Sequence, residues 1–340
     1  MSAPGCPPPF LPSRWLRNRH LQTLLGTVLR RDPAITGMRR LRVELDDGDF
    51  IDVDVATPRD RHETGSWVLV LHGLEGSSRS RYVRGMAAAL LASGHEVCLM
   101  NYRGCSGEPN RLPRAYHGGA TADVRTVMER LSGERPGRPF AAVGFSIGAN
   151  MLMKLLGEDQ RLVPAGLVAT VAISAPFDLE RCMHFLDRRS RTRGIYRRQL
   201  LRTLRTKALC KLERFPGCIP ASPAAVRATR TFSAFDELYT APIHGFPDAT
   251  DYYRCISGER YLHRIAHPML ILSASDDPFF PRNYVPQAAI AANARLTLVL
   301  TDRGGHCGFV GGPAWSPAYW AEQATVGYLA HQFGLTSTLP

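Results

Sequence analysis

Short apolar runs alternate with helical segments through most of this chain. The runs at residues 67–71, 97–100, 140–143 and 167–173 are almost entirely apolar, which is typical of strands that are buried on both faces. Between them, helical patterns occupy residues 82–92, 120–131 and 147–156. Strands and helices in alternation predict βαβ units, and therefore a doubly wound, mostly parallel sheet of the α/β class.

Other segments complete the predicted layout. Residues 41–45 and 50–55 alternate apolar and polar side chains, which predicts an antiparallel hairpin ahead of the parallel sheet. Strand patterns return at 269–272 and 296–300, and a last helix is expected at 318–333. Residues 176–265 break the alternation, so we interpret them as a helical cap over the carboxyl end of the sheet. The expected division is an N-terminal extension (1–36, with an amphipathic segment at 15–29), an α/β core (37–175 and 266–340) and the cap (176–265).

The composition is that of an ordinary globular protein. The chain has 340 residues, 44% hydrophobic and 21% charged, and no segment approaches the roughly 20 apolar residues of a membrane span. Residues 1–9 lack the charged start and apolar core of a signal peptide. The eight cysteines are scattered and form no C-x-x-C pair. We therefore expect reduced thiols in a cytoplasmic protein, with no disulfide framework, no metal site and no cofactor.

Positive charge is concentrated in one segment. The net charge is +12, and nine basic residues with no acid fall between positions 188 and 207. The plainest interpretation is a solvated helical face. A surface that contacts anionic lipid headgroups at the membrane periphery is the sharper alternative. A nucleic-acid partner is disfavoured, because no stacking motif or zinc-finger spacing accompanies the charge.

The stretch with the clearest chemical meaning is Gly144-Phe145-Ser146-Ile147-Gly148, which follows the apolar run at 140–143. A strand, a G-x-S-x-G turn and a helix in this order describe a nucleophile elbow. The two glycines have a steric purpose, because a Cβ at either position would meet the opposite arm of the turn. Ser146 is therefore the candidate nucleophile, close to a helix N-terminus whose free N–H groups stabilise negative charge.

A serine nucleophile needs a base, and the base needs a carboxylate. His306 is the candidate base, because it lies in a glycine-rich loop after the last predicted strand. Asp276 and Asp277 follow the strand pattern at 269–272. Asp277 heads an Asp-Pro-x-x-Pro run and is the preferred acid, and Asp276 would then hydrogen-bond the backbone. The order serine, aspartate, histidine is that of α/β-hydrolases.

Two backbone N–H groups should complete the site as an oxyanion hole. One is expected at Ile147, directly after the serine, and the other at Leu74, in the glycine-containing loop after the strand at 67–71. His72, at the start of that loop, is interpreted as structural, because a ring at a strand end bonds nearby backbone. Arg103, in the glycine-rich turn at 101–110, is interpreted as holding neighbouring loops together.

Together these segments resemble the YheT-like family of α/β-hydrolases, also called AB hydrolase family 4. The resemblance rests mainly on residues 20–23, 72–76, 101–110, 144–150, 276–279 and 304–309. It implies an α/β-hydrolase fold and a carboxylic-ester hydrolase whose triad is Ser146, Asp277 and His306. It also implies relatives that act on acylglycerols and phospholipids, some of them as acyltransferases. Two departures from the family pattern, Ala149 and the sequence at 118–120, remove no member of the triad.

The leading hypothesis is a serine esterase that acts through an acyl-enzyme on small esters of short to medium acyl chain, acylglycerols and phospholipids among them. Acyl transfer to an alcohol shares the same intermediate, so the sequence leaves it open. A lipid-binding protein on an inactive hydrolase scaffold is the alternative from another class, and it predicts a broken triad. Acyl length, headgroup and oligomeric state are left open.

Overall fold

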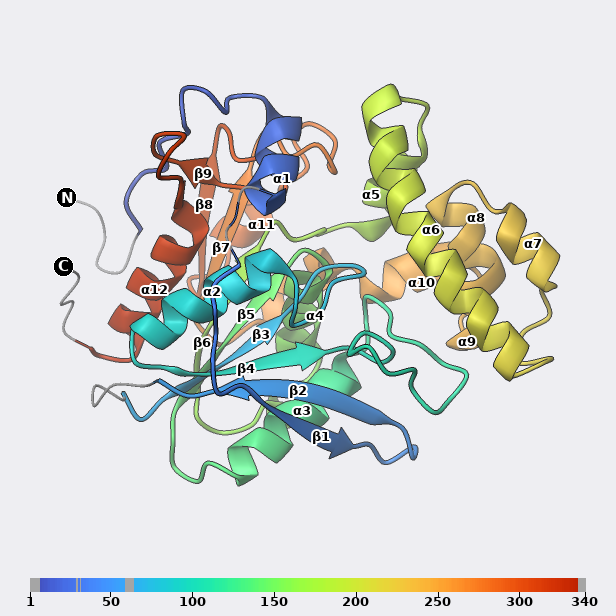
Figure 1. Cartoon of the computed structure of the whole chain (residues 1–340), viewed down its shortest axis with the longest axis horizontal. Helices are drawn as coiled ribbons and strands as arrows, with labels where there is room; N and C mark the ends of the chain where they lie inside the picture. The colour runs from blue at the N-terminus through green and yellow to red at the C-terminus, as the bar shows by residue number, and fades with distance from the viewer. Residues whose placement is uncertain (1–6, 29, 31, 59–63, 336–340) are drawn as a thin grey trace.

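The protein is described from a computed structural model, which covers residues 7–28, 30, 32–58 and 64–335. Its main sheet has eight strands in the order β1-β2-β4-β3-β5-β6-β7-β8 (Figure 1). The strands are β1 (Arg39–Glu44), β2 (Phe50–Ala56), β3 (Trp67–Leu71), β4 (Glu96–Asn101), β5 (Phe140–Phe145), β6 (Leu167–Ile173), β7 (Met269–Ala274) and β8 (Leu296–Thr301). β2 pairs antiparallel with β1 and β4, and all other neighbours are parallel. The predicted sheet with its antiparallel start is confirmed.

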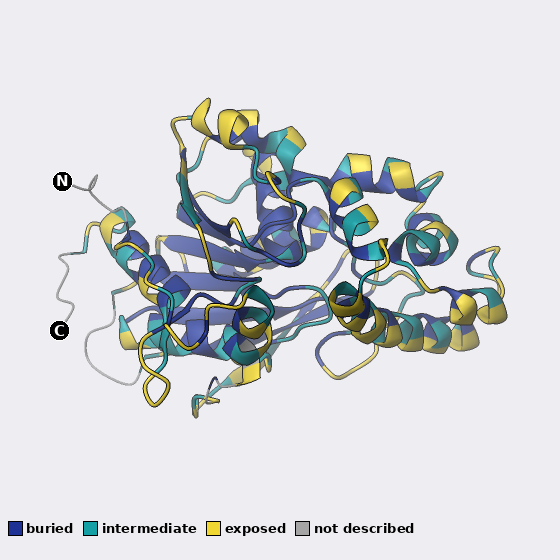
Figure 2. Ribbon diagram, turned by 90° about the horizontal axis from the view of Figure 1, so that it is seen from above, coloured by how far each residue is buried: buried dark blue, intermediate teal, exposed yellow. Residues whose placement is uncertain are grey.

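Helices cover both faces of the sheet. α2 (Arg81–Ala92) and α12 (Trp320–Gln332) pack on one face, and α3 (Thr121–Gly133) and α4 (Ile147–Glu158) pack on the other. Along β3, Val68 and Val70 face the first pair of helices while Leu69 and Leu71 face the second. All four side chains are fully buried, which explains the uninterrupted apolar sequence of β3. Figure 2 shows the sheet buried between these layers.

The strand order changes direction at β3. The chain places β4 on one side of β3 and β5 on the other, so the loops that follow β3 and β5 diverge at the carboxyl ends of these strands. Doubly wound sheets bind ligands at such a switch point. The fold therefore puts residues 72–80 and the turn at Ser146 where a ligand is expected.

The segment between β6 and β7 forms a group of helices beyond one end of the sheet (Figure 1). They are α5 (Leu179–Asp187), α6 (Arg191–Arg214), α7 (Pro223–Ala228), α8 (Phe232–Phe235), η2 (Asp236–Thr240), α9 (Ala241–Ile243), α10 (Ala249–Ile256) and η3 (Gly258–Arg264). Side chains of Ser190, Ser222 and Thr231 cap three of these helices by accepting backbone N–H groups. The segment is helical as expected, and its treatment as a separate domain stays a prediction.

The remaining elements are short. They are α1 (Arg19–Val28), η1 (Gln160–Leu162), α11 (Gln287–Ala291), β9 (Val310–Gly311) and β10 (Ala318–Tyr319). α1 is shorter than the amphipathic segment expected at 15–29, of which residue 29 lies outside the described residues. The last helix begins at Trp320 rather than at 318, because the two preceding residues pair with β9 as a strand.

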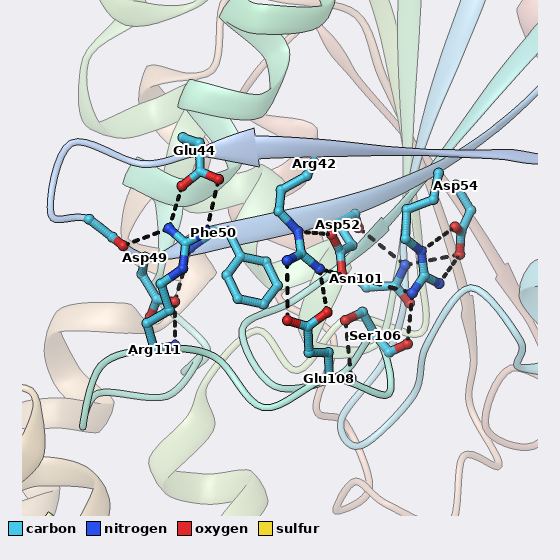
Figure 3. A network of polar contacts seen from close by, with 12 residues as sticks. Arg42, Glu44, Asp49, Phe50, Asp52, Asp54, Asn101, Ser106, Glu108 and Arg111 are labelled. Atoms are coloured by element: carbon cyan, nitrogen blue, oxygen red, sulfur yellow. Dashed lines mark hydrogen bonds and ion pairs between the residues drawn. The ribbon is translucent and has the colours of Figure 1, made fainter.

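Ion pairs attach the β1–β2 hairpin to the loop after β4 (Figure 3). Arg42 bonds Asp52 at 2.8 Å and Glu108 at 2.6 Å, and Arg111 bonds Glu44 at 2.9 Å. Most of these groups are partly exposed to solvent. Each pair therefore contributes little to stability, although together they define where the loop lies.

Candidate active site

A sharp turn joins β5 to α4 and places Ser146 at its apex. Ser146 has a φ of 51° and a ψ of −116°, which is a strained backbone for a residue with a side chain. Its N–H donates to Ile173 O at 2.8 Å. A Cβ on Gly144 would lie 2.5 Å from Gly148 O, and a Cβ on Gly148 would lie 2.8 Å from His72 O. The turn therefore needs glycine on both arms.

The side chains of Ser146, His306 and Asp277 form one hydrogen-bonded chain. His306 Nε2 lies 3.0 Å from Ser146 Oγ, and His306 Nδ1 lies 2.8 Å from Asp277 Oδ2. Asp277 is only 3% exposed, so little water competes for its carboxylate. At these distances an imidazole can take a serine proton while a carboxylate fixes its tautomer.

Asp276 has a different partner from its neighbour. Asp276 Oδ1 accepts the Gly305 N–H at 2.9 Å, which ties the acid loop to the histidine loop. Asp277 Oδ1 accepts the Phe279 N–H at 2.9 Å, and Oδ2 is left for His306. The structure brings Asp277, and not Asp276, to the imidazole.

Burial and charge act in opposite directions on His306. Burial lowers the pKa of an imidazole, but the Asp277 carboxylate outweighs it and raises the pKa of His306 above the ordinary value of 6.5. Phe279 stacks on the ring with centroids 4.1 Å apart, and Phe280 meets it edge-on at 5.5 Å. These two rings hold the imidazole in place. Neither phenylalanine was given a role from the sequence, although both lie in the Asp-Pro-x-x-Pro run.

Two backbone N–H groups beside Ser146 have no acceptor within the described ranges. Ile147 is the first residue of α4, where intrahelical acceptors are missing, and the N–H of Leu74 is also free. A Cβ on Gly73 would lie 3.3 Å from Ser146 Cβ, so the loop after β3 approaches the elbow closely. Leu74 and Ile147 line the same cavity as Ser146, so their N–H groups are candidates to bind an oxyanion formed there.

α1 holds the histidine loop, a contact that the sequence analysis missed. Thr23 Oγ1 accepts the His306 N–H at 2.9 Å. Gln22 is fully buried; its Oε1 accepts the Val310 N–H at 2.8 Å and its Nε2 donates to Val310 O at 2.9 Å. A Cβ on Gly308 would collide with Gln22 O. The one signal in the sequence was the stretch at 20–23, which was noted for its family resemblance and given no function.

His72 and Arg103 have the structural roles that the sequence analysis gave them. His72 is fully buried, its Nδ1 donates to Gly73 O at 2.7 Å, and burial lowers its pKa to about 3. Arg103 makes two bonds of 2.7 Å to Asp123 and another of 2.7 Å to Asp47. Both side chains are committed to partners of the scaffold.

A sequence profile described as the alpha/beta hydrolase fold matches residues 66–313. The match begins one residue before β3 and contains all three residues of the hydrogen-bonded chain. This protein belongs to the α/β-hydrolase family. The α/β-hydrolase family expected from the sequence is thereby confirmed.

Relatives of this α/β-hydrolase are named as esterases and lipases. YheT of Escherichia coli (strain K12), an esterase by name, is 40% identical over 92% of this chain and 90% of its own. The monoacylglycerol lipase of Saccharomyces cerevisiae is 32% identical over 71% of this chain and 54% of its own. The hydrolase is therefore an enzyme of the esterase and lipase type.

Solved structures share the fold at low sequence identity. Esterase Pf2001 of Pyrococcus furiosus superposes on the hydrolase with a TM-score of 0.52 at 15% identity, over 88% of each chain. The 2,6-dihydroxy-pseudo-oxynicotine hydrolase superposes with a TM-score of 0.55 at 16% identity, over 93% of this chain and 73% of its own. At such identities the likeness concerns the fold alone.

The hydrolase has a cavity of about 260 Å³ over Ser146. Its outer wall comes from the helices after β6 and is largely apolar, with Cys182, Met183, Leu186, Leu200 and Phe232. Thr23 of α1 also borders the cavity. The cavity suits an apolar group attached to the reacting carbonyl.

The basic segment of the hydrolase lies on α6 and the turn before it. Its exposed members are Arg188, Arg189, Arg191, Arg198 and Arg202. Of its nine basic residues, Lys207 alone pairs with an acid of the described chain, Glu75, at 3.0 Å. The exposed charge is therefore not neutralised by the protein itself.

Other expectations for the hydrolase concern membranes, cysteines and metals. In the part of the chain that the structure covers, no helix combines the length and apolar character needed to cross a bilayer. Seven cysteines are free thiols, and Cys6 lies outside the described residues. The described residues contain no cluster of three or more side chains suited to a metal ion. The cofactor, metal and cytoplasmic assignments stay predictions.

Proposed function

We propose that this hydrolase cleaves carboxylic esters through an acyl-enzyme on Ser146. The observation that supports the proposal best is the hydrogen-bonded chain from Ser146 Oγ through His306 to Asp277, with contacts of 3.0 and 2.8 Å. Such a chain gives a weak nucleophile its base and gives the base its orientation. A lipid-binding scaffold without catalysis would not need these three groups within reach of one another.

The mechanism follows from the positions of these groups. Ser146 Oγ attacks the ester carbonyl while His306 Nε2 takes its proton, and the N–H groups of Leu74 and Ile147 donate to the oxyanion. The ester C–O bond then breaks, and His306 returns the proton to the leaving alcohol. Water attacks the acyl-enzyme with His306 again as base. The acid is released and Ser146 regains its proton.

The proposed substrates are esters with an apolar acyl chain of short to medium length. The apolar wall over Ser146 supports this class. The named relatives extend it to lipids, since they include the yeast monoacylglycerol lipase and a phospholipase of Mus musculus that is 28% identical over 93% of this chain and 75% of its own. Acylglycerols and phospholipids are therefore the natural substrates to try.

Activity-based labelling tests the nucleophile directly. A fluorophosphonate probe should label the purified protein, and peptide mapping should place the label on Ser146. Ser146→Ala should abolish labelling and lower kcat for p-nitrophenyl butyrate by about 10⁴-fold or more. Ser106→Ala, in a loop outside the cavity, is the matched control and should label normally. Undiminished labelling of Ser146→Ala would overturn the assignment.

Acyl transfer to an alcohol is the second candidate function. It is supported by a Saccharomyces cerevisiae relative, named as a medium-chain fatty acid ethyl ester synthase/esterase, that is 30% identical over 72% of this chain and 58% of its own. In this reaction an alcohol replaces water in the attack on the acyl-enzyme. Product ratios in water–ethanol mixtures measure it. An ethyl ester yield no greater than the alcohol's share of the solvent would reject a dedicated transferase.

We also propose that the basic face of α6 contacts anionic membrane surfaces. Ile195 of α6 and Leu24 of α1 are exposed apolar side chains, and a 3.1 Å contact between His20 Nδ1 and Tyr196 OH joins the two helices. Thr23 of α1 borders the cavity over the serine. An apolar and basic surface therefore lies next to the site, as a lipid substrate would require.

Vesicle sedimentation tests this contact. Binding to phosphatidylglycerol vesicles should exceed binding to phosphatidylcholine vesicles and should weaken as salt rises, because exposed charge is screened. A double change, Arg198→Glu with Arg202→Glu, should weaken binding. Arg161→Glu, exposed elsewhere on the surface, should not. Equal binding to both kinds of vesicle would reject the proposal.

A further inference from the structure

Three neighbouring cavities lie in a row beneath the helices that follow β6. The cavity over the serine shares four lining residues with a narrow space of about 60 Å³, namely Leu74, Ile147, Met183 and Phe232. That space, here called the throat, shares four others with a cavity of about 330 Å³, namely Tyr116, Leu204, Phe235 and Thr240. We call this last cavity the distal chamber. Shared walls make the three spaces adjoin.

One face of α6 borders the whole row. Leu200 lines the cavity over the serine, Leu204 lines both the throat and the distal chamber, and Ala208 and Lys211 line the chamber alone. Spacings of three and four residues put these side chains on one side of the helix. About 16 Å of helix axis separates Leu200 from Lys211. The row therefore suits a ligand that is long and narrow.

The throat lies on the side of Ser146 where the acyl chain of a bound ester is expected. Leu74 and Ile147, which carry the proposed oxyanion donors, border the throat. Within the described chain, no residue of the acid loop or the histidine loop borders it. Because His306 must protonate the leaving oxygen, the leaving alcohol occupies the opposite, histidine side. The throat is thus positioned to receive the acyl chain.

The distal chamber contains a buried cation that lacks an acid partner. Lys211 is 8% exposed, and its ammonium donates to the backbone carbonyls of Asn110, at 3.1 Å, and Leu112. No carboxylate of the described residues lies within 4.0 Å of it. Asp49 acts on it from further away and is already bonded to Arg103 at 3.1 Å. Burial lowers the pKa of Lys211 to about 8, because desolvation disfavours the charged form.

Other polar groups of the chamber wall have no hydrogen-bond partner among the described residues. Tyr239 is 5% exposed, and its hydroxyl is buried with no hydrogen-bond partner among the described residues. The same holds for His244 Nδ1. Buried polar groups are normally satisfied, and buried charges are normally paired. An anionic oxygen in the chamber would accept hydrogen bonds from the Lys211 ammonium and the Tyr239 hydroxyl.

We propose that the distal chamber binds a carboxylate at the far end of the substrate's acyl chain. The substrate class is then a monoester of a dicarboxylic acid whose carbon chain spans the row. The ester carbonyl lies at Ser146, the methylene chain passes Leu204 and Phe235, and the free carboxylate lies at Lys211. This proposal rests on the proposed esterase function, and it selects the longer members of the acyl range given there.

Three p-nitrophenyl esters test the chamber: the butyrate, the laurate and the monoester of dodecanedioic acid. For the wild type, kcat/KM for the dodecanedioate ester should exceed that for laurate by about tenfold, the effect of one charge-assisted hydrogen bond. In Lys211→Met this ratio should fall to about one, because the ammonium is gone. Glu213→Met, on the exposed side of α6, is the matched control and should keep the wild-type ratio.

A substitution at Leu204 tests whether the acyl chain passes through the throat. Leu204→Trp should lower the ratio of kcat/KM for laurate to that for butyrate by roughly tenfold, because the indole fills the passage. Leu204→Phe serves if the tryptophan variant does not fold. Butyrate hydrolysis and probe labelling report the esterase function separately. If the wild type neither hydrolysed butyrate nor reacted with the probe, the proposed esterase function would be contradicted, and the proposal for the distal chamber would not be the cause.

The proposal is overturned if the wild type shows no preference for the dodecanedioate ester, or if Lys211→Met keeps the preference. An unchanged laurate-to-butyrate ratio in both Leu204 variants would also overturn it. Inorganic phosphate tests whether the chamber instead binds a free anion that is not part of the substrate. Inhibition of laurate hydrolysis by phosphate in the wild type and not in Lys211→Met, without a preference for the dodecanedioate ester, would assign the chamber to a free anion instead.

Discussion

The backbone N–H of His306 donates to Thr23 Oγ1 over 2.9 Å, although the two residues are 283 positions apart. Thr23 Oγ1 in turn donates to Arg19 O at 2.9 Å, so its hydroxyl is held within α1. Gln22 bonds both backbone groups of Val310, four residues after the histidine. α1 therefore positions the backbone of the residue that carries the proposed base.

Thr23→Val should slow the enzyme without unfolding it. The valine keeps the shape of threonine but leaves the His306 N–H unpaired, which costs about 1–3 kcal/mol. Where that cost falls on the transition state, kcat/KM drops roughly five- to hundredfold. Steady-state kinetics with p-nitrophenyl butyrate measures the drop, and Thr23→Ser should restore most of the rate. Thr297→Val, exposed on β8, is the control. Wild-type kinetics in Thr23→Val would show that the bond is not needed.

The Asp277 carboxylate should set the pH at which His306 acts as a base. It raises the pKa of His306 above 6.5, and only the neutral imidazole accepts a proton. The rate kcat/KM should therefore rise with pH and level off only above the raised pKa. In Asp277→Asn the midpoint should move to lower pH, and the plateau should fall about 10⁴-fold.

A pH–rate profile of each variant measures both effects. Asp276→Asn is the matched control, because Asp276 bonds the Gly305 N–H and asparagine keeps an acceptor oxygen there. Its midpoint should stay close to that of the wild type. A midpoint in Asp277→Asn that is equal to or higher than the wild-type value would contradict the role given to this carboxylate.

The sheet and the elbow were predictable because their signals are local. Each central strand is buried on both faces, so its sequence is apolar throughout, and β3 was predicted with its observed bounds. The elbow needs glycine at 144 because of a contact within the turn itself, with Gly148 O, whereas the glycine at 148 is needed because of His72 O in the loop after β3. Ile147 could be named as an oxyanion donor because it directly follows Ser146.

The contacts that the sequence did not reveal join distant segments. Gln22 and Val310 are 288 positions apart, and neither lies in a pattern that points to the other. Lys211 is a second example. It lies beyond the basic segment at 188–207, and nothing in the sequence indicated that it bonds the backbone at Asn110. Side-chain pairing of this kind depends on how the elements pack. It cannot be predicted from the periodicity of a segment or from the order of motifs along the chain.

Glycine at position 144 should be essential to the elbow. A Cβ there would lie 2.5 Å from Gly148 O, a backbone atom that cannot move without opening the turn. Gly144→Ala should therefore lower the melting temperature and remove most of the activity. Gly133→Ala is the matched control at the end of α3, where an added Cβ meets nothing within 4 Å; it should stabilise the protein by about 0.5–1 kcal/mol. Thermal unfolding and probe labelling distinguish the two. Normal labelling in Gly144→Ala would contradict the steric argument.

Arg103 should be the most important ion-pairing residue of the scaffold around the hairpin. It is 4% exposed, and its guanidinium bonds Asp123 and Asp47 at 2.7 Å and Asp49 at 3.1 Å. Arg103→Met would leave the buried carboxylates of Asp49 and Asp123 without their cation, which costs about 3–5 kcal/mol. Denaturant unfolding measures the loss. Arg111→Met, which breaks a neighbouring but exposed pair, should have a much smaller effect because water replaces the lost partner. Equal losses in the two variants would show that burial does not determine the strength of this network.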